Sequence, residues 1–357
     1  MSEGKIRVGF IGAGKNTRER HIPGFLKQEG VEFVSVANRS PESSRQVAEQ
    51  FGIPKVAADW REVLDDPEVD AVCIGTWPYM HKTLTIAALE AGKHVLCEAR
   101  MAMNSVEAHA MLEASRRHPR LVAQIVPSPL TFPFDRTIAE TIGSGGIGEL
   151  ISLDARIAVG SDFPNPDSPI HWRHDRDFSG NNIMAMGIWY EAMMRWVGPA
   201  ASVYAVGRSV VRHRRDGNGR RVPMTIPDHV DIVGEMEQGG QMRFAISTVV
   251  GHAPAAEVWI FGTEGTLCLR RTGTEEMKLL HGRRGGKGLE ELTIDPAKRG
   301  GWRVEEEFVN AIRGREPVTH TDFVTGAKYM EWTDAVTASL RSGQAVRLPL
   351  AVGSLRL

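Results

Sequence analysis

The segment from Lys5 to Thr17 constrains the fold more than any other part of the chain, because it joins a strand to two closely spaced glycines. Lys5–Ile11 has the β-branched, apolar character of a buried strand, and Gly12-Ala13-Gly14-Lys15-Asn16-Thr17 follows it directly. The first glycine of such a motif allows a tight turn, and the second lets a pyrophosphate approach the backbone where the next helix starts. The motif predicts a dinucleotide-binding turn; the alternative is an ordinary glycine turn between strand and helix.

Thr17 stands where this kind of motif usually has a third glycine. That glycine serves close packing between the helix and the strand, so we expect the helix here to lie slightly further from the sheet. Asn16 and Thr17 are nevertheless expected to contact the dinucleotide together with Gly12 and Gly14.

The end of the second predicted strand, Glu32–Ala37, decides which dinucleotide fits. An acidic residue there would bond the ribose 2′-OH and repel a 2′-phosphate. The sequence instead continues with the neutral Asn38, with Arg39, which can form charge-assisted hydrogen bonds to phosphate, and with the hydroxyl of Ser40. This pattern predicts NADP rather than NAD. The alternative is that Arg39 covers the adenine of NAD.

Strands and helices alternate over the first third of the chain, which is typical of parallel βαβ units. Pro127, Pro129 and Pro133 end the alternation, so we expect a nucleotide-binding α/β domain over residues 1–126 and a second domain over 127–357. The expected strands of the first domain are Lys5–Ile11, Glu32–Ala37, Ala71–Gly75, Val95–Glu98 and Leu121–Val126, and its expected helices are Pro41–Phe51, His81–Ala91 and Ser105–Arg117.

The second domain contains successive β-branched runs separated by turns, which predicts an α+β domain with a large open, mainly antiparallel sheet. Its expected strands are Leu150–Val159, Ala201–Val211, Val230–Glu237, Met242–Val249, Glu257–Phe261, Thr266–Arg271 and Glu290–Ile294. Its expected helices are Gly187–Val197, Trp302–Arg313 and Asp322–Ser342, the last of which can pack back on the first domain.

The composition excludes several kinds of partner. Lys and Arg number 43 against 44 Asp and Glu, a formal charge of −1, so the basic field of a nucleic-acid-binding protein is missing. The arginine-rich segment Arg212–Arg221 has a Gly-Asn-Gly centre and is expected to form a solvated hairpin loop, with a phosphate-binding patch as the alternative. No apolar stretch reaches the roughly 20 residues that span a bilayer, and no signal segment precedes the first strand. We expect a cytoplasmic protein that binds neither membrane nor nucleic acid.

The metal-binding residue types show no spacing typical of a metal site. The three cysteines are too few and too scattered for a disulfide framework or a zinc site, so buried, reduced thiols are expected. His171, His174 and Asp175 lie close in sequence but lack the spacing of zinc ligands. We therefore expect no metal.

Several segments spread over nearly the whole chain resemble one known family. They are GFIGAGKNTRERHIPGF, TWPYMHKTLTIAALEAGKHVLCEARMA, GSGGIGELISLDARI, HWRHDRDFSGNN, FGTEGTLCLR and LRSGQAVRLPL, and their order and spacing resemble those of the glucose–fructose oxidoreductase and inositol dehydrogenase (Gfo/Idh/MocA) family. The resemblance implies a Rossmann domain followed by a domain with a large open sheet. It also implies a nicotinamide cofactor, hydride transfer to or from a sugar or cyclitol, and pairing of copies through the open sheet. A homo-oligomer, dimer or tetramer, is expected.

Three positions depart from the family's catalytic pattern. Glu98-Ala99-Arg100 stands where the family has Glu-Lys-Pro, so the lysine that would help to remove the proton of the reacting hydroxyl is absent. Ala185 and Trp189 stand where the resemblance places an aspartate and the acid/base histidine. Cofactor binding survives these departures, whereas the family's usual set of proton carriers does not.

Nearby polar residues are candidates to replace the missing proton carriers. Tyr190 could donate a proton if a cation such as Arg100 lowered its pKa, and His174 lies in the block that carries the family's Trp-Arg pair. The alternatives are a core or pocket-wall position for Tyr190 and a solvated surface position for His174. The residues expected to contact the cofactor are Gly12, Gly14, Asn16, Thr17, Asn38, Arg39, Ser40, Thr76, Trp77, His81, Glu98 and Arg173.

Two classes of function follow from these observations. The first is an NADP-dependent oxidoreductase that acts on a sugar-like or cyclitol-like, polyhydroxylated small molecule. The second is a lyase, epimerase or glycoside-cleaving enzyme that retains its cofactor without net redox, because a changed set of proton carriers can accompany changed chemistry. A non-catalytic cofactor-binding protein is a third alternative.

Overall fold

The computed structural model describes residues 4–158, 163–272 and 276–351, so Val159, the end of one predicted strand, lies outside the described residues. The chain divides into two compact units. Unit 1 consists of Met1–Pro127 and Trp302–Ala327, and unit 2 consists of Ser128–Gly301 and Lys328–Leu357. The segment 302–327 thus belongs to unit 1, although nearly all of unit 2 precedes it in the sequence.

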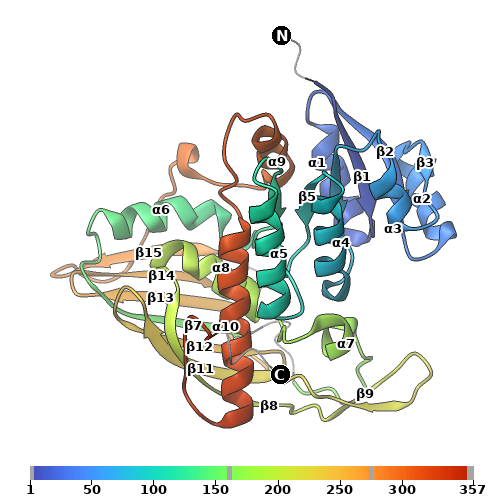
Figure 1. The fold of residues 1–357 in the computed structure, drawn as a ribbon. Coiled ribbons are helices and arrows are strands. Elements are labelled where there is room, and N and C mark those ends of the chain that lie inside the picture. The colour runs from blue at the N-terminus through green and yellow to red at the C-terminus, as the bar shows by residue number, and fades with distance from the viewer. Residues whose placement is uncertain (1–3, 159–162, 273–275, 352–357) are drawn as a thin grey trace. The chain divides into compact units, whose positions relative to one another are not determined.

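Unit 1 contains a parallel sheet, which has six strands among the described residues, in the order β3-β2-β1-β4-β5-β6 (Figure 1). The strands are β1 Ile6–Ile11, β2 Val31–Ala37, β3 Lys55–Val56, β4 Ala71–Ile74, β5 His94–Cys97 and β6 Ala123–Ile125. This is the predicted Rossmann arrangement, in which the direction of strand succession reverses between β1 and β4. Dinucleotides bind at such a reversal, at the carboxyl ends of the strands.

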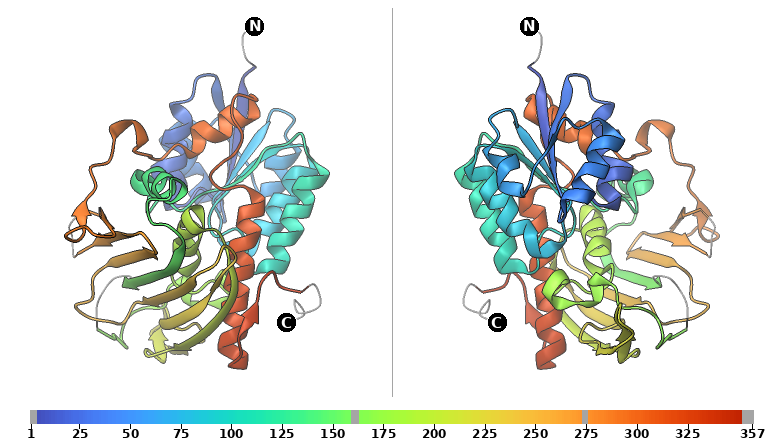
Figure 2. Two further views of the ribbon diagram at one scale, coloured as in Figure 1. Left: turned by 90° about the vertical axis from the view of Figure 1, so that its left-hand side faces the viewer. Right: turned by 90° about the vertical axis from the view of Figure 1, so that its right-hand side faces the viewer.

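Helices cover both faces of this sheet, with α9 on one side and α4 and α5 on the other (Figure 2). Buried residues of α1, α2 and α9 form one core with Val8, Phe10 and Val36 of the sheet. The helical segments of unit 1 are η1 Thr17–His21, α1 Ile22–Leu26, α2 Pro41–Phe51, α3 Trp60–Asp65, α4 Pro78–Glu90, α5 Ser105–Arg117 and α9 Val304–Ile312. The helix predicted over Pro41–Phe51 is confirmed with these bounds, and Gly52, which follows it, has a φ of +67°, which glycine adopts without strain.

Unit 2 contains the predicted open sheet, which has nine strands among the described residues, in the order β16-β15-β14-β13-β7-β12-β11-β8-β17. Neighbouring strands are antiparallel except β7 and β12, which are parallel. The strands are β7 Leu150–Ala158, β8 Ala200–Arg208, β11 His229–Met236, β12 Gln241–Ser247, β13 Ala256–Gly262, β14 Gly265–Arg271, β15 Lys278–Arg283, β16 Glu290–Glu291 and β17 Val346–Arg347. The strand predicted over Glu290–Ile294 is therefore shorter than expected.

Helices α8 and α10 cover one face of this sheet. Tyr190 of α8 stacks on Trp332 of α10 with ring centroids 4.0 Å apart, and Trp332 also stacks on Phe244 of β12. The opposite face carries the exposed side chains of Tyr204, Val206 and Val233. The remaining helical segments of unit 2 are α6 Phe132–Gly143, η2 Trp172–His174, α7 Arg176–Ser179, α8 Met186–Val197 and η3 Pro296–Lys298, and α10 runs over Phe323–Ser342 across the unit boundary.

Two segments of unit 2, the arginine-rich hairpin and the proline-rich stretch near residue 130, can be compared with their predictions. The predicted hairpin at Arg212–Arg221 is confirmed, because β9 His213–Arg215 pairs with β10 Arg221–Pro223, although the side chain of Arg214 is buried. The prolines near residue 130 end the Rossmann pattern but do not prevent the helix α6. Pro133 lies in its first turn, where a missing backbone N–H leaves no hydrogen bond unmade. Within the described residues, no helix is long and apolar enough to cross a membrane.

Candidate functional site

Gly12 and Gly14, the two glycines after β1, are each required for a different structural reason. Gly12 has a φ of +78°, and a Cβ there would lie 2.8 Å from the backbone nitrogen of Thr76. At Gly14, the nearest atoms to an added Cβ are carbonyl oxygens 3.8 Å away, so the space above this residue is open. A side chain at position 14 would fill that space, which is where the sequence predicts the pyrophosphate to approach the backbone.

Thr17 replaces the third glycine of the motif, and a glycine elsewhere in the sequence provides the space for its side chain. Thr17 is fully buried, and a Cβ added to Gly75, directly after β4, would overlap with the hydroxyl of Thr17. Thr17 therefore packs into the room that Gly75 leaves at the end of the neighbouring strand. The sequence pattern after β1 alone does not reveal this pairing, because the two residues are far apart in the chain.

The residues after β2 provide a neutral and cationic surface instead of the acidic residue of an NAD site. The Asn38 side-chain oxygen accepts a hydrogen bond from the backbone N–H of Ala13 at 2.6 Å, and its amide donates to the Ser43 hydroxyl at 2.8 Å. Ser40 caps α2 by accepting from the backbone N–H of Ser43. Arg39 is exposed beside this helix start.

The residues of this region fit a dinucleotide. The hydroxyl of Thr76 is buried beside the glycine turn and has no hydrogen-bond partner among the described residues. This hydroxyl, the open space at Gly14 and the exposed Arg39 offer unfilled room and unused polar groups where the Rossmann arrangement places its cofactor.

A buried histidine joins the glycine turn to the end of β5. The Nε2 atom of His21 lies 2.9 Å from Glu98 Oε1, and its Nδ1 atom lies 2.5 Å from Glu305 Oε1. The Asn16 amide also donates to Glu98. Burial by itself would lower the pKa of His21, but the hydrogen bonds to Glu305 and Glu98 outweigh it and raise the pKa to about 9. The same contact with His21 lowers the pKa of Glu98, although burial opposes this.

His21 and Glu305 were not among the residues predicted for the site. His21 occurs in the sequence as one polar residue after the glycine turn, and Glu305 lies 284 residues further on. No local pattern connects them, since α9 returns to unit 1 only after the chain has formed the sheet of unit 2.

His81 braces the backbone around the expected cofactor site. Its ring is fully buried, with Nδ1 2.9 Å from the carbonyl oxygen of Arg100 and Nε2 2.9 Å from that of Thr76. Burial lowers the pKa of this histidine. Because both ring nitrogens face carbonyl oxygens, we correct the expectation of a direct cofactor contact and assign His81 to the support of these two segments. Trp77 is half-buried at the start of α4, and the Arg100 side chain is buried.

Tyr190 is a core residue of unit 2. It is 1% exposed, it stacks on Trp332, and its hydroxyl accepts a hydrogen bond from the backbone N–H of Ala200 at 2.8 Å. Burial raises its pKa. The expectation that a neighbouring cation lowers the pKa of Tyr190 is therefore wrong, because the apolar surroundings disfavour the charged phenolate.

His174 and Arg173 lie together on η2 in unit 2. The Nδ1 atom of His174 accepts a hydrogen bond from the backbone N–H of His171 at 3.1 Å. Burial, and next to it the charge of Arg214, lower the pKa of His174 to about 4. The guanidinium of Arg173 lies 4.2 Å from the ring centre of Trp172. Within the described residues, no group of three or more metal-ligating side chains is arranged to hold an ion.

Two family models match the chain. Residues 6–125 match "Oxidoreductase family, NAD-binding Rossmann fold", and residues 136–268 match "GFO/IDH/MocA C-terminal domain". The levoglucosan dehydrogenase of Pseudarthrobacter phenanthrenivorans is 26% identical over 299 residues, which cover 78% of this chain and 76% of the relative. The 1,5-anhydro-D-fructose reductase of Ensifer adhaerens is 29% identical over 298 residues, 82% of this chain and 84% of the relative.

Solved structures share the fold over almost the whole chain. An oxidoreductase domain protein from Kribbella flavida has a TM-score of 0.83 at 21% identity and covers 97% of this chain and 100% of its own. A levoglucosan dehydrogenase in complex with NADH and L-sorbose has a TM-score of 0.80 at 24% identity, with 97% and 99% covered. At this level of identity the likeness shows the fold.

Proposed function

The chain belongs to the Gfo/Idh/MocA oxidoreductase family, and from that premise we propose that it is an NADP-dependent oxidoreductase of a sugar-like or cyclitol-like small molecule. The family match makes it an NAD(P)-dependent oxidoreductase, and relatives named as dehydrogenases and reductases act on carbohydrates. The observation that carries the proposal is the glycine turn, where the space above Gly14 is open and the buried hydroxyl of Thr76 has no hydrogen-bond partner among the described residues.

The preference for NADP rests on the residues after β2. Asn38 carries no charge to repel a 2′-phosphate, and its side chain is held by Ala13 and Ser43. Arg39 is exposed beside the start of α2, where partial positive charge also favours an anion. An acidic side chain at position 38 would favour NAD by the same reasoning.

The proton chemistry depends on a non-standard set of residues. When bound, the nicotinamide gives or takes the hydride. His174 is neutral near pH 7, and because its Nδ1 accepts a hydrogen bond from the backbone N–H of His171, its Nε2 carries the hydrogen and can donate a hydrogen bond to a substrate oxygen. We assign Arg100, buried at the end of β5, to an anionic oxygen of the cofactor or substrate. Ala99, Ala185 and Trp189 have no group that could carry a proton.

Direct titration tests the cofactor proposal. The eight tryptophans of the chain allow binding of NADPH and NADH to be followed by protein fluorescence. Arg39→Ala should weaken NADPH binding by about tenfold, because a charge-assisted hydrogen bond is lost, while NADH binding stays within about twofold. Equal affinity of the wild type for both cofactors would overturn the preference for NADP, and absence of binding would overturn the function.

The absence of the family's usual proton carriers favours one alternative function. This alternative is a lyase, epimerase or glycoside-cleaving enzyme that retains its cofactor. Such an enzyme would purify with bound cofactor and turn over substrate with no change in absorbance at the reduced-nicotinamide band. Native mass spectrometry would detect the retained cofactor. Net production of NADPH or NADH from a polyhydroxylated substrate would exclude this alternative.

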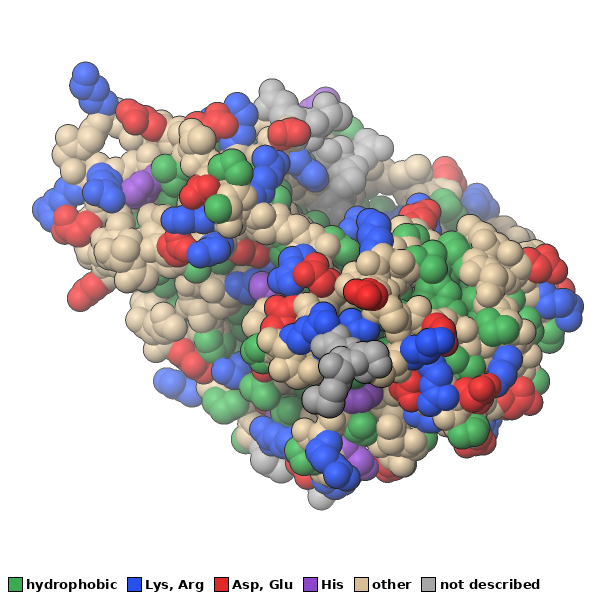
Figure 3. Space-filling model, turned by 90° about the horizontal axis from the view of Figure 1, so that it is seen from above, with side chains coloured by type: hydrophobic (Ala, Val, Ile, Leu, Met, Phe, Trp, Pro, Cys, Tyr) green, Lys and Arg blue, Asp and Glu red, His purple; other side chains and the backbone are tan. Residues whose placement is uncertain are grey.

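We also propose that the partner of the open sheet face is a second copy of this chain. Tyr204 and Val233 lie opposite each other on β8 and β11, and both are exposed, as is Val206. A monomer rarely exposes neighbouring large apolar side chains on a sheet without a covering layer. The balance of 43 Lys and Arg against 44 Asp and Glu does not favour a nucleic acid, and the two kinds of charge are interspersed on the one face of the molecule that Figure 3 shows.

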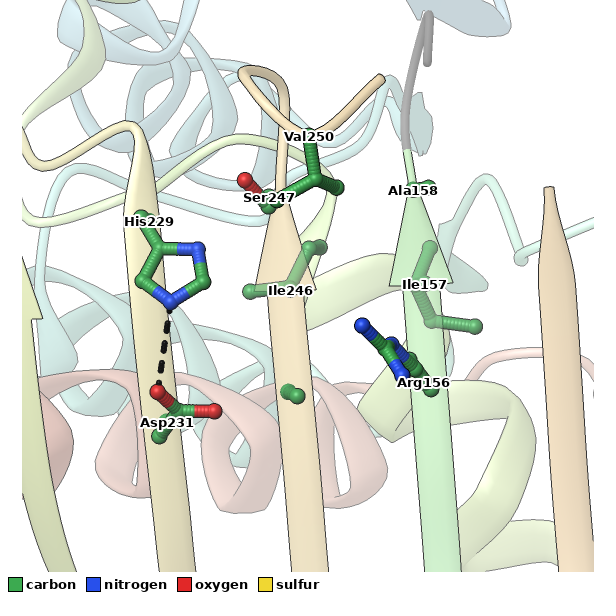
Figure 4. A pocket seen from close by; sticks show the side chains of 9 residues that line it. Arg156, Ile157, Ala158, His229, Asp231, Ile246, Ser247 and Val250 are labelled. Atoms are coloured by element: carbon green, nitrogen blue, oxygen red, sulfur yellow. Dashed lines mark ion pairs between the residues drawn. The ribbon is translucent and has the colours of Figure 1, made fainter. Parts of the chain in front are cut away.

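A hollow on the same face adds charge complementarity. Its volume is about 350 Å³, and it lies at the ends of β7, β11 and β12 (Figure 4). Arg156 lines one side, and His229 and Asp231, paired at 3.3 Å, line the other. A two-fold axis can place the basic side of one copy against the acidic side of the other. Sedimentation that finds only 39.3 kDa monomers at micromolar concentration would rule out the pairing.

A further inference from the structure

The cofactor turn of unit 1 adjoins a buried cluster with an unusual concentration of negative charge. The cluster consists of His21, Glu98 and Glu305, with the Glu98 side chain 13% exposed and the Glu305 side chain 2% exposed. Two carboxylates in such a place would repel each other and would also repel the pyrophosphate that the adjacent glycine turn is built to hold. A positive charge is needed to offset them.

His21 is placed to supply that charge. Each of its ring nitrogens faces one carboxylate, at 2.9 Å for Glu98 and 2.5 Å for Glu305, so both can donate when the ring is protonated. Among the described residues, the other groups that bond to the two carboxylates are neutral. They are the Asn16 amide, the backbone N–H of Ala99 and the Trp302 indole.

The neighbouring elements contribute few other charges. Arg20, on η1, lies 4.7 Å from the ring centre of Trp302, and the buried thiol of Cys73, on β4, has a pKa raised by burial and by the two carboxylates. The cluster therefore has a charge of −1 with protonated His21 and −2 with neutral His21. The hydrogen bond from the Asn16 amide to Glu98 connects this cluster to the glycine turn, because Asn16 is part of that turn.

We propose that His21 is an internal counter-ion and positioning residue that holds Glu98 and Asn16 in place and thereby lets the glycine turn accept the pyrophosphate of the dinucleotide. This inference rests on the proposed function, because it requires that a nicotinamide dinucleotide binds at Gly12 and Gly14. It adds a pair of residues, His21 and Glu305, that reach the cofactor only through others.

The proposal predicts a particular dependence of cofactor affinity on pH. Because the pKa of His21 is raised to about 9, the ring is cationic at pH 7 and loses its charge as the pH rises further. The affinity for NADPH, and likewise for NADH, should fall about tenfold from near pH 7 to near pH 10 as the cluster gains a negative charge. Adenosine 2′-phosphate lacks the pyrophosphate, so its binding should not follow this curve.

A pair of variants separates charge from packing. His21→Gln leaves two carboxylates without their cation, so it should weaken cofactor binding about tenfold near pH 7 and abolish the dependence on pH. The double variant His21→Gln/Glu305→Gln carries one carboxylate, the net charge of the native cluster, and should regain most of the lost affinity. A merely structural role predicts the reverse, because the double variant loses two native side chains instead of one.

The readout is fluorescence titration with NADPH, with circular dichroism as the check on folding. Recovery in the double variant together with the pH curve of the wild type supports the proposal. A double variant that binds no better than His21→Gln, or a wild-type affinity that is constant to about pH 10, overturns it. If the single variant does not fold, the wild-type pH curve decides. A wild type that binds neither cofactor near pH 7 instead overturns the proposed function itself.

Discussion

His21 and His174 show how two regions of one protein drive the same side chain in opposite directions. Burial lowers the pKa of both rings. At His21, in unit 1, hydrogen bonds to Glu305 and Glu98 outweigh burial and raise the pKa to about 9, whereas at His174, in unit 2, Arg214 adds to burial and the pKa falls to about 4. The sign of the neighbouring charges, more than the depth of burial, decides which histidine is a cation at pH 7.

This difference separates two chemical roles. The region around His21 is an ion cluster beside the glycine turn, suited to fixing a charged cofactor. The region around His174 has a neutral imidazole among arginines, suited to donating a hydrogen bond while the cations attract an anionic or polar group. Each role can be tested by removing the charge that creates it.

The largest expected effect comes from breaking the cluster of His21. Glu305→Ala removes one of its two carboxylates and leaves a buried imidazolium half-paired, so the free energy of unfolding at pH 7 should fall by about 3 kcal/mol. Urea denaturation measures the change. Glu306→Ala is the matched control, because this neighbouring side chain is about half exposed and pairs with the half-exposed Arg303, and its loss should cost under about 1 kcal/mol. Similar losses in both variants would contradict the assigned role of the cluster.

The pH dependence of stability should have two limbs with different origins. The folded-state pKa of His21 is raised, so its stabilisation is complete below about 6.5, its unfolded value, and is lost as the pH rises through about 9. That loss should be on the order of 3 kcal/mol, because the two values differ by about 2.5 pKa units. The folded-state pKa of His174 is lowered, so its contribution is complete above about 6.5 and is lost as the pH falls through about 4.

Variants of the two histidines can show which histidine causes each limb of the dependence of stability on pH. His21→Gln should flatten the alkaline limb of the unfolding free energy against pH and leave the acidic limb in place. His174→Gln should lessen the acidic limb, to which buried carboxylates also contribute, and leave the alkaline limb unchanged. Thermal or urea unfolding between about pH 4 and pH 10 measures both. If neither variant changed the limb assigned to it, the opposite shifts would be disproved.

The smallest effect sharpens the comparison at His174 alone. Arg214→Gln removes the cation that lowers the pKa of His174, so that pKa should rise by about one unit in an NMR titration of the imidazole protons. Arg215→Gln is the control, since the Arg215 side chain is half exposed and pairs with Asp167. An unchanged pKa of His174 in Arg214→Gln would mean that the charge of Arg214 does not contribute to its value.

Much of the fold of unit 1 can be predicted from the sequence. The strand Lys5–Ile11, the two glycines and the succession of strands and helices predict the Rossmann unit, and the turn after it follows from the motif. The hairpin at Arg212–Arg221 and the helix Pro41–Phe51 were also predictable. These features depend on residues that are close in sequence, so their physical causes can be read from a short stretch of chain.

The tertiary structure decided what each polar residue does. It paired His21 with Glu305 across 284 residues and gave Thr17 its room at Gly75. It buried Val203, Ile232 and Ile260 and left Val206 exposed on the open face. Alternation within a strand predicts which residues share a face, but not which of the two faces is covered. The tertiary structure also buried Tyr190 against Trp332. A pKa or a packing contact depends on groups that the fold brings together, and the sequence specifies those neighbours only through the complete chain.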